Sequence, residues 1–254
     1  MQFISSVKNE QIKQLKKLHT KKGRRQQQRY LLEGEHLVQE ALAAKVELSQ
    51  LYVTQDFINH DVHHLIKQYH DQTTQITPEV AQSLAETITP QGIFAVTNLV
   101  KPALPTSWSG QWLLLDQVQD PGNVGTMVRT ADAAGLKGVV LSSDSVDVYQ
   151  SKVQRAMQGS QFHLPVFTAD LLPVVTQMQQ QKIPVWGTLV DRQAISYQQI
   201  APQANWALIM GNEAHGLSST LTAMTDQNIY IPLSGQAESL NVAVAAGVLM
   251  FSLR

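Results

Sequence analysis

The chain has 254 residues, of which 43% are hydrophobic and 15% charged, a composition typical of a globular protein. It contains no cysteine, which excludes disulfides, thiolate metal sites and a cysteine nucleophile. The N-terminal stretch MQFISSVKNEQIKQLKK lacks the apolar core of a signal peptide, and the longest apolar run, residues 242–251, is too short to span a bilayer. We therefore expect a soluble cytoplasmic protein.

The formal net charge of −1 conceals an uneven distribution of charge along the chain. The first 29 residues contain nine of the 19 Lys and Arg side chains but only one acid, Glu10. This basic density favours contact with a polyanion, since phosphate contacts dominate nucleic-acid affinity. An ordinary solvated helix face is the alternative, but the rest of the chain is acidic, which favours nucleic acid.

The first hundred residues alternate between helical and extended patterns. Residues 1–20 predict a basic helix in which Ile12, Leu15 and Leu18 share one face. The segment KKGRRQQQR, residues 21–29, predicts an exposed turn. The elements predicted after it are, in order, a strand that turns into a helix (30–45), a strand (48–57), two helices (61–70 and 77–88) and a strand (92–100).

The segment KPALPTSWSGQ, residues 101–111, predicts a linker, because it combines two prolines, two serines and a glycine. We place a domain boundary there, giving domains 1–104 and 105–254. Short apolar runs separated by helical patterns follow, which predicts an α/β fold with a mostly parallel sheet covered on both faces. The runs are 112–116, 138–143, 164–169, 183–190, 206–211 and 228–233.

Ligands of such sheets bind at the carboxyl ends of the strands, so the segments after the apolar runs are the informative ones. The first, DPGNVGTMVRTADAAG, has two glycines spaced G-x-x-G, which match neither the dinucleotide fingerprint nor the phosphate loop. This counts against a kinase, an NTPase or a standard dehydrogenase. The predicted helix leaves Arg129 opposite its apolar stripe. An ordinary exposed arginine and, for Asn123, a helix N-cap are the alternatives. The stripe comprises Val124, Met127, Val128 and Ala131.

Two further segments carry polar residues in the same kind of position. In NEAHGLS, Glu213 and His215 suggest a metal site, but their i, i+2 spacing and the lack of a third ligand nearby argue against one. An acid at a helix N-terminus would explain Glu213 equally well. In SGQAESLN, a loop precedes an apolar helix, and a helix cap would account for Ser239. The polar residues at the mouth of this helix are Glu238, Ser239 and Asn241.

Taken together, three segments resemble the ordered motifs of the SpoU (TrmH-type) RNA ribose 2′-O-methyltransferases of the SPOUT superfamily. They are DPGNVGTMVRTADAAG, LIMGNEAHGLS and IPLSGQAESLNVAVAAGVLMF. The segment LLEGEHLVQEAL, residues 31–42, resembles the N-terminal substrate-binding domain of many of these enzymes, which is related to a ribosomal-protein RNA-binding fold. His215 and Ala243 depart mildly from the residues common in the family. The resemblance implies a C-terminal domain with a deep trefoil knot, preceded by a small α/β substrate-binding domain.

The resemblance also implies S-adenosylmethionine as the cofactor, bound in a bent shape by the knot loops. The residues implied to bind it are Gly211, Ile231 and Leu240, largely through the backbone, and Gly187, Thr188 and Leu189 on the adenine side. No metal is implied. Arg129 matches the catalytic arginine of the family, and we expect it to stabilise the developing alkoxide, since a guanidinium does not readily lose its proton. The residues expected to hold that arginine and the ribose are Asn123, Glu213, Ser239 and Asn241.

We therefore expect an RNA ribose 2′-O-methyltransferase. Ribosomal RNA, with 23S rRNA foremost, is favoured over tRNA because the N-terminal domain resembles the rRNA-modifying branch. The alternatives are a tRNA methyltransferase, an RNA-binding relative without catalysis, and a doubly wound nucleotide-binding enzyme.

A homodimer is expected from the last helix, residues 239–254, which is apolar on all sides and has no later segment to cover it. One face is formed by Leu240, Val244, Val248 and Phe251, and a flatter one by Ala243, Ala246, Gly247 and Met250.

Overall fold

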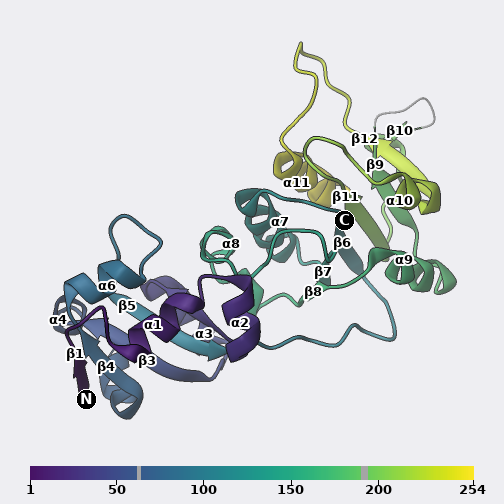
Figure 1. Ribbon diagram of the computed structural model, residues 1–254. Coiled ribbons are helices and arrows are strands. Elements are labelled where there is room, and N and C mark those ends of the chain that lie inside the picture. Colours follow the sequence, from purple (N-terminus) through teal and green to yellow (C-terminus); the bar gives the residue numbers. More distant parts are fainter. Residues whose placement is uncertain (62–63, 190–193) are drawn as a thin grey trace. The chain divides into compact units, whose positions relative to one another are not determined.

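The computed structural model describes residues 1–61, 64–189 and 194–254 and divides into two compact units (Figure 1). Unit 1 comprises residues 1–100 and 149–162, and unit 2 comprises 101–148 and 163–254. The sequence placed a single boundary near residue 105. It did not predict that the segment 149–162 would belong to the N-terminal unit.

Unit 1 is built on a mixed sheet, in which β5 runs antiparallel to its two neighbours and the other pairs are parallel. The strands lie in the order β1 (Gln2–Ile4), β4 (Thr73–Ile76), β3 (Leu48–Thr54), β5 (Ile93–Asn98) and β2 (Arg29–Glu33). The sequence predicted β2, β3 and β5. It missed β1 and β4, which at three and four residues are too short to show an alternating pattern.

Helices cover both faces of this sheet. On one face lie α1 (Glu10–Lys17) and α6 (Pro78–Leu84), and Ile12, Leu15 and Leu18 are buried there as predicted. On the other lie α3 (Glu35–Ala43), α4 (Gln55–Asn59) and α5 (Leu65–Gln68). The helix predicted over 61–70 is shorter than expected, and its residues 62 and 63 lie outside the described part of the chain.

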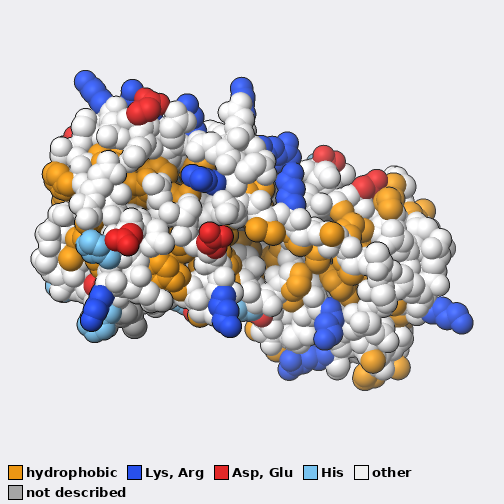
Figure 2. All heavy atoms as spheres, turned by 90° about the horizontal axis from the view of Figure 1, so that it is seen from below, with side chains coloured by type: hydrophobic (Ala, Val, Ile, Leu, Met, Phe, Trp, Pro, Cys, Tyr) orange, Lys and Arg blue, Asp and Glu red, His pale blue; other side chains and the backbone are white. Residues whose placement is uncertain are grey.

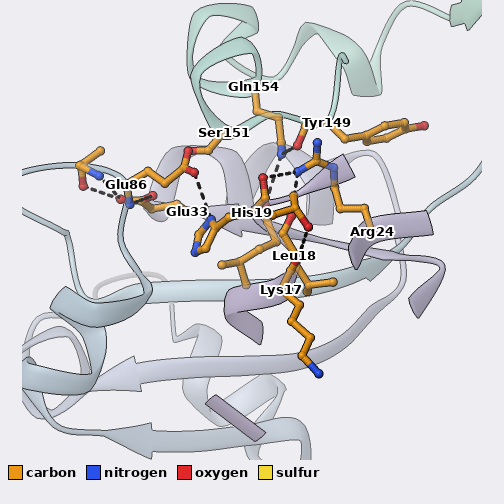
Figure 3. Close-up of polar contacts among 12 residues, drawn as sticks. Lys17, Leu18, His19, Arg24, Glu33, Glu86, Tyr149, Ser151 and Gln154 are labelled. Atoms are coloured by element: carbon orange, nitrogen blue, oxygen red, sulfur yellow. Dashed lines mark hydrogen bonds and ion pairs between the residues drawn. The ribbon is translucent and has the colours of Figure 1, made fainter. Parts of the chain in front are cut away.

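The segment predicted as an exposed turn is instead helix α2 (Lys21–Gln27), so that prediction was wrong. Its Gly23 packs so tightly that an added Cβ would lie 1.9 Å from the carbonyl oxygen of Lys17. Its Arg24 is only 2% exposed and donates hydrogen bonds to the carbonyls of Leu18 (2.8 Å) and His19 (3.0 Å), as Figure 3 shows. A charged residue therefore anchors α2 by binding the C-terminal carbonyls that α1 leaves open.

Helix α8 (Ser151–Met157) belongs to unit 1 although it follows the first strands of unit 2 in the sequence. It covers β2, which is an edge strand of the unit 1 sheet. The buried amide of Gln154 donates to the carbonyls of Leu31 (3.2 Å) and Tyr149 (2.9 Å) (Figure 3). An edge strand with open carbonyls needs such a cover, and here a distant segment supplies it.

Unit 2 contains an all-parallel sheet, which confirms the α/β fold with a mostly parallel sheet. Its strands lie in the order β10 (Ile195–Ser196), β12 (Gln227–Tyr230), β9 (Val185–Thr188), β11 (Trp206–Met210), β6 (Gln111–Leu115), β7 (Gly138–Leu141) and β8 (Val166–Thr168). Each predicted apolar run overlaps one of these strands. The two-residue β10 was not predicted, and Val190, at the end of the fourth run, lies outside the described residues.

Two helices pack on each face of this sheet. On one face lie α9 (Leu171–Gln180) and α10 (Ser219–Met224). On the other lie α7 (Pro121–Ala133), whose predicted apolar stripe is buried, and α11 (Val242–Ser252). The Trp206 indole donates to the carbonyl of Leu253 (3.0 Å), which ties the end of α11 to β11. Among the helices of the described residues, none has the length and apolar character needed to cross a membrane.

Candidate cofactor and ribose site

A cavity of about 540 Å³ opens in unit 2 where β9, β11 and β12 end. Its wall is formed by the loops that follow these three strands, by the first residues of α11 and by Asn123 of α7. This is the carboxyl edge of a parallel sheet, where ligands of such folds bind. The long loop between β12 and α11 contributes much of the wall and stands out from the body of the unit in Figure 1.

Most of the residues predicted from the sequence meet at this cavity. The exceptions are Arg129 and Gly187. Those that line it are Asn123, Thr188, Leu189, Gly211, Glu213, Ile231, Ser239, Leu240 and Asn241.

At Gly211, the backbone of the loop that follows β11 folds back on itself. A Cβ at this position would lie 2.3 Å from the carbonyl carbon of Gly216 and 2.4 Å from the nitrogen of Leu217. The fold-back is closed by two backbone hydrogen bonds of 2.9 Å between Asn212 and Gly216. No side chain fits at position 211, and this leaves bare backbone exposed to the cavity.

Three side chains join the three motif segments in one chain of hydrogen bonds. The Glu213 carboxylate accepts from the Asn123 side chain (3.1 Å) and from the backbone N–H groups of Asp120 (3.0 Å) and Gln119 (3.2 Å). The Asn123 carbonyl oxygen in turn accepts from the Asn241 amide (3.0 Å). The loops after β6 and β11 and the start of α11 are thereby held against one another.

The sequence left open that Asn123 and Ser239 serve as helix caps, but neither of them is an N-cap in the structure. The N-cap of α7 is Asp120, whose carboxylate accepts from the N–H of Asn123 (2.9 Å), so the Asn123 side chain is left for the cavity. The N-cap of α11 is Asn241 rather than Ser239. Its oxygen accepts from the first N–H groups of that helix at 2.9 and 3.3 Å, while its amide donates to Asn123.

Glu213 is held as an anion by these contacts. Partial burial by itself would raise the pKa of the Glu213 carboxyl. Hydrogen bonds from the Asn123 side chain and from the backbone N–H groups of Glu213, Asp120 and Gln119 outweigh burial, so the pKa lies below its ordinary value. A carboxylate with this many donors is suited to fixing a loop rather than to accepting a proton.

Arg129 lies further along α7 than Asn123, by about 9 Å of helix rise, and it is exposed. It does not line the cavity. None of the described residues forms a hydrogen bond or an ion pair with its guanidinium, so its five donors are unengaged within that part of the chain.

Gly187 lies in the middle of β9 rather than at the cavity. A Cβ at Gly187 would meet the side chains of Asn228 (2.4 Å), Thr225 (2.8 Å) and Leu217 (2.9 Å). Close packing between β9, β12 and the segments beside α10 explains this glycine. On the adenine side expected from the sequence, the cavity therefore has only Thr188 and Leu189.

The structure adds residues that sequence reasoning missed. Asn212 lines the cavity, accepts from the N–H groups of Ala214 (2.9 Å) and His215 (3.1 Å), and donates to the carbonyl of Gln117 (2.8 Å). The position of Asn212 inside the motif segment LIMGNEAHGLS was a sign of a role in the site. Its hydrogen-bond partner Gln117, however, is distant in the sequence. Other added lining residues are Tyr230, Leu233, Ala245 and Leu249. Within the described residues, no group of three or more His, Asp or Glu side chains is arranged to hold a metal ion.

Comparison with known proteins shows two family models that match the chain. The SpoU rRNA Methylase family model matches residues 111–251, and the MRM3-like substrate binding domain model matches residues 9–95. The chain is 43% identical to the 23S rRNA (guanosine(2553)-2′-O)-methyltransferase RlmP of Bacillus subtilis (strain 168), with 100% of both chains covered.

Two solved structures contain the cofactor. An AdoMet-bound rRNA methyltransferase from Sinorhizobium meliloti has a TM-score of 0.89 and 26% identity, covering 100% of this chain and 97% of that one. The SpoU methyltransferase AviRb from Streptomyces viridochromogenes, in complex with AdoMet, has a TM-score of 0.86 and 25% identity, covering 97% of each chain.

The matches to a methylase family and to a substrate binding domain place the chain among the RNA-modifying transferases. The chain belongs to the SpoU rRNA methylase family, which confirms the resemblance of its three motif segments. It is an rRNA ribose 2′-O-methyltransferase that uses S-adenosylmethionine.

Proposed function

We propose that this chain methylates the ribose 2′-hydroxyl of one guanosine in 23S rRNA, with the cofactor held in the cavity of unit 2. The name of the Bacillus subtilis relative, which is similar over its full length, supports the choice of nucleotide. The observation that carries the site assignment is the hydrogen-bond chain from Glu213 through Asn123 to Asn241, because it assembles three distant segments beside one cavity.

The cavity fits the cofactor in size and in the character of its wall. Its volume lies within the range of small-molecule sites. Gly211, Ile231 and Leu240 would hold the cofactor largely by backbone groups, and Thr188 and Leu189 would border its adenine. The Thr188 hydroxyl already donates to the carbonyl of Ile209 (2.9 Å), which fixes its orientation. When bound, S-adenosylmethionine supplies an electrophilic methyl group on a sulfonium.

The residues of the chain must then orient a weak nucleophile and stabilise the charge that develops on it. Arg129 is suited to bind the phosphate beside the reacting ribose and to stabilise the alkoxide, because none of the described residues engages its donors. A guanidinium does not act as a base. Asn123, Ser239 and Asn241 would position the ribose, while Glu213 holds Asn123 in place.

The proposal also includes a trefoil knot, a homodimer and a cytoplasmic location. The motif order supports a trefoil knot formed by the C-terminal loops. The exposed apolar side chains Val244 and Phe251 of α11 support a homodimer. The cytoplasmic location predicted from the sequence stays a prediction, supported by the rRNA substrate.

The test is methylation of in-vitro-transcribed 23S rRNA by the purified chain, with 2′-O-methyl groups mapped along the RNA. We expect one modified guanosine. Arg129→Ala should lower the rate of methyl transfer about 10²- to 10³-fold, because a preorganised donor is lost, while cofactor affinity measured by calorimetry stays unchanged. Arg129→Lys, which keeps the charge but not the planar donor set, should recover only part of the rate. Normal turnover by Arg129→Ala would show that this arginine is not catalytic.

A further inference from the structure

Unit 1 contains a cavity of about 330 Å³ that plays no part in the site described above. Its wall is formed by the junction of β2 and α3, by the loop between α6 and β5, and by α8. Its volume lies at the lower end of the range of small-molecule sites, enough for a single nucleobase.

The wall of this cavity is held by a buried carboxylate. Glu33 is 8% exposed and accepts hydrogen bonds from the N–H groups of Glu86 (3.0 Å) and Thr87 (3.2 Å) and from the Thr87 hydroxyl. Figure 3 shows Glu33 beside Glu86, whose backbone N–H donates to the Glu33 carboxylate while its own carboxylate pairs with His19. At the other end of the loop, the Gln91 side chain accepts from the N–H of Glu35 (2.8 Å). The loop 86–91 is therefore fixed at both ends.

The cavity offers donors and acceptors rather than a cluster of positive charge. The Arg155 guanidinium donates to the Ser151 hydroxyl and lies 3.8 Å from the Glu33 carboxylate, so its remaining N–H groups are preorganised at the wall. The His36 Nε2 lies 3.1 Å from the carbonyl oxygen of Gln158 and must carry a proton to donate to it. In a neutral imidazole, Nδ1 is then an acceptor. This mixture matches the edge of a nucleobase better than a phosphate.

The loop that contributes Thr87 and Thr89 to this wall also carries an exposed apolar residue. Ile88, between the lining residues Thr87 and Thr89, is 94% exposed, more than any other large hydrophobic side chain among the described residues. Single exposed hydrophobics are common on proteins, but this one lies on a loop that is pinned in place by Glu33. RNA-binding proteins read unpaired nucleotides by combining stacking or packing against the base with hydrogen bonds to its edge. Ile88 would supply the packing contact here, and the polar wall would supply the hydrogen bonds.

We propose that this cavity receives one unpaired nucleotide of the rRNA substrate, with the base against Ile88 and its polar edge at Arg155, Thr89 and His36. The proposal rests on the proposed function, in which rRNA is the substrate. Arg155 lies outside the segment that matches the substrate binding domain and inside the segment that matches the methylase family. Substrate recognition in unit 1 would thus depend on a helix from the methylase part of the sequence.

The experiment uses the full chain and in-vitro-transcribed 23S rRNA, with binding measured by filter retention and methyl transfer measured separately. Ile88→Ser should weaken RNA binding about tenfold and raise KM to a similar extent, with kcat and cofactor affinity unchanged. Arg155→Gln should have an effect of similar size. Val100→Ser is the matched control, since Val100 is 67% exposed and lies just beyond the opposite end of β5, where binding should not change.

The outcomes separate this proposal from its rivals. Ile88 is solvent-exposed, so Ile88→Ser should keep the thermal stability of the wild type and remain decisive even if Arg155→Gln fails to fold. Wild-type RNA binding by Ile88→Ser would overturn the proposal. Normal binding of naked rRNA, with a loss seen only on assembled ribosomal subunits, would also overturn it and indicate a protein partner. Ile88-dependent RNA binding by a chain that transfers no methyl group would support this site while contradicting the proposed function.

Discussion

The side-chain amides of Asn123 and Asn241 each donate one hydrogen bond through nitrogen and accept at least one through oxygen. These bonds hold the segments of the site together. Asn241 accepts from the first turn of α11 and donates to Asn123, and Asn123 accepts that bond and donates to Glu213. Glu213 and Asn241 are exposed, so water can replace a lost partner, but each replacement still removes a bond from the network that the three residues share. The three residues therefore act as one unit, and single substitutions among them should not be additive.

The residue-scale prediction concerns pH. The pKa of Glu213 is lowered in the folded chain, so its contribution to stability is fully present above the unfolded value of about 4.3 and is lost as the pH falls through the folded pKa. Glu213→Gln should therefore lower Tm at pH 7, and the difference from wild type should shrink below about pH 4. Thermal melts across pH 3 to 7 would measure this. Glu238→Gln is the control, because no described residue donates a hydrogen bond to that carboxylate. A Tm difference independent of pH would contradict the prediction.

At the scale of elements, the unexpected feature is how closely helices α1 and α2 pack against each other. The basic segment of the sequence is not uniformly a surface for RNA, since Arg24 is buried against the end of α1. On the face seen in Figure 2, Lys and Arg side chains are spread over the surface in several separate groups rather than in one continuous patch. The cations that remain exposed on α1 and α2 are held in position by the packing of Gly23 and Arg24 beneath them.

Gly23→Ala should destabilise unit 1, because the new Cβ would lie 1.9 Å from a backbone oxygen that no rotamer change can move. Overpacking of this kind typically costs about 1–3 kcal/mol. Denaturant unfolding of the full chain would measure the loss. Gly235→Ala is the matched control, since no atom lies within 4 Å of its added Cβ. Equal stability of the two variants would mean that α1 and α2 can separate without cost.

At the scale of the whole molecule, α11 is only partly covered by its own chain. Ala243, Ala246 and Met250 are buried, and a Cβ on Gly247 would lie 3.6 Å from the Thr130 side chain of α7. The flatter face of this helix is therefore covered within the chain. The face that includes Val244 stays exposed, and a second copy of the chain is the occupant we propose for it.

Val244→Asp should convert the dimer to a monomer, because a charge would be buried without a partner in the interface. Val244 is 55% exposed in the single chain, so the monomer should stay folded. Sedimentation velocity at micromolar concentration distinguishes the 28.1 kDa chain from a species of twice that mass. Val100→Asp, a charge at an exposed valine of unit 1, should leave the dimer intact. A wild-type chain that sediments as a monomer would refute the proposed dimer.

Much of the fold and most of the predicted cavity residues could be identified from local sequence patterns. Unbroken apolar runs indicated the parallel sheet of unit 2, and the stripe of α7 was buried as its spacing predicted, because periodicity records which face of an element leaves water. Most of the predicted motif residues after the strands line one cavity, because the carboxyl ends of parallel strands share an edge, but Arg129 does not.

What local sequence could not supply depends on partners far along the chain. That α8 covers β2 rests on Gln154 reaching Leu31, and the link between the motif loops rests on Asn241 reaching Asn123, both across more than a hundred residues. Gly187 was placed at the cofactor by its motif but is required by its neighbours in space. No periodicity encodes such contacts, since they form only when separate elements pack, and folding must offset the entropy of bringing them together.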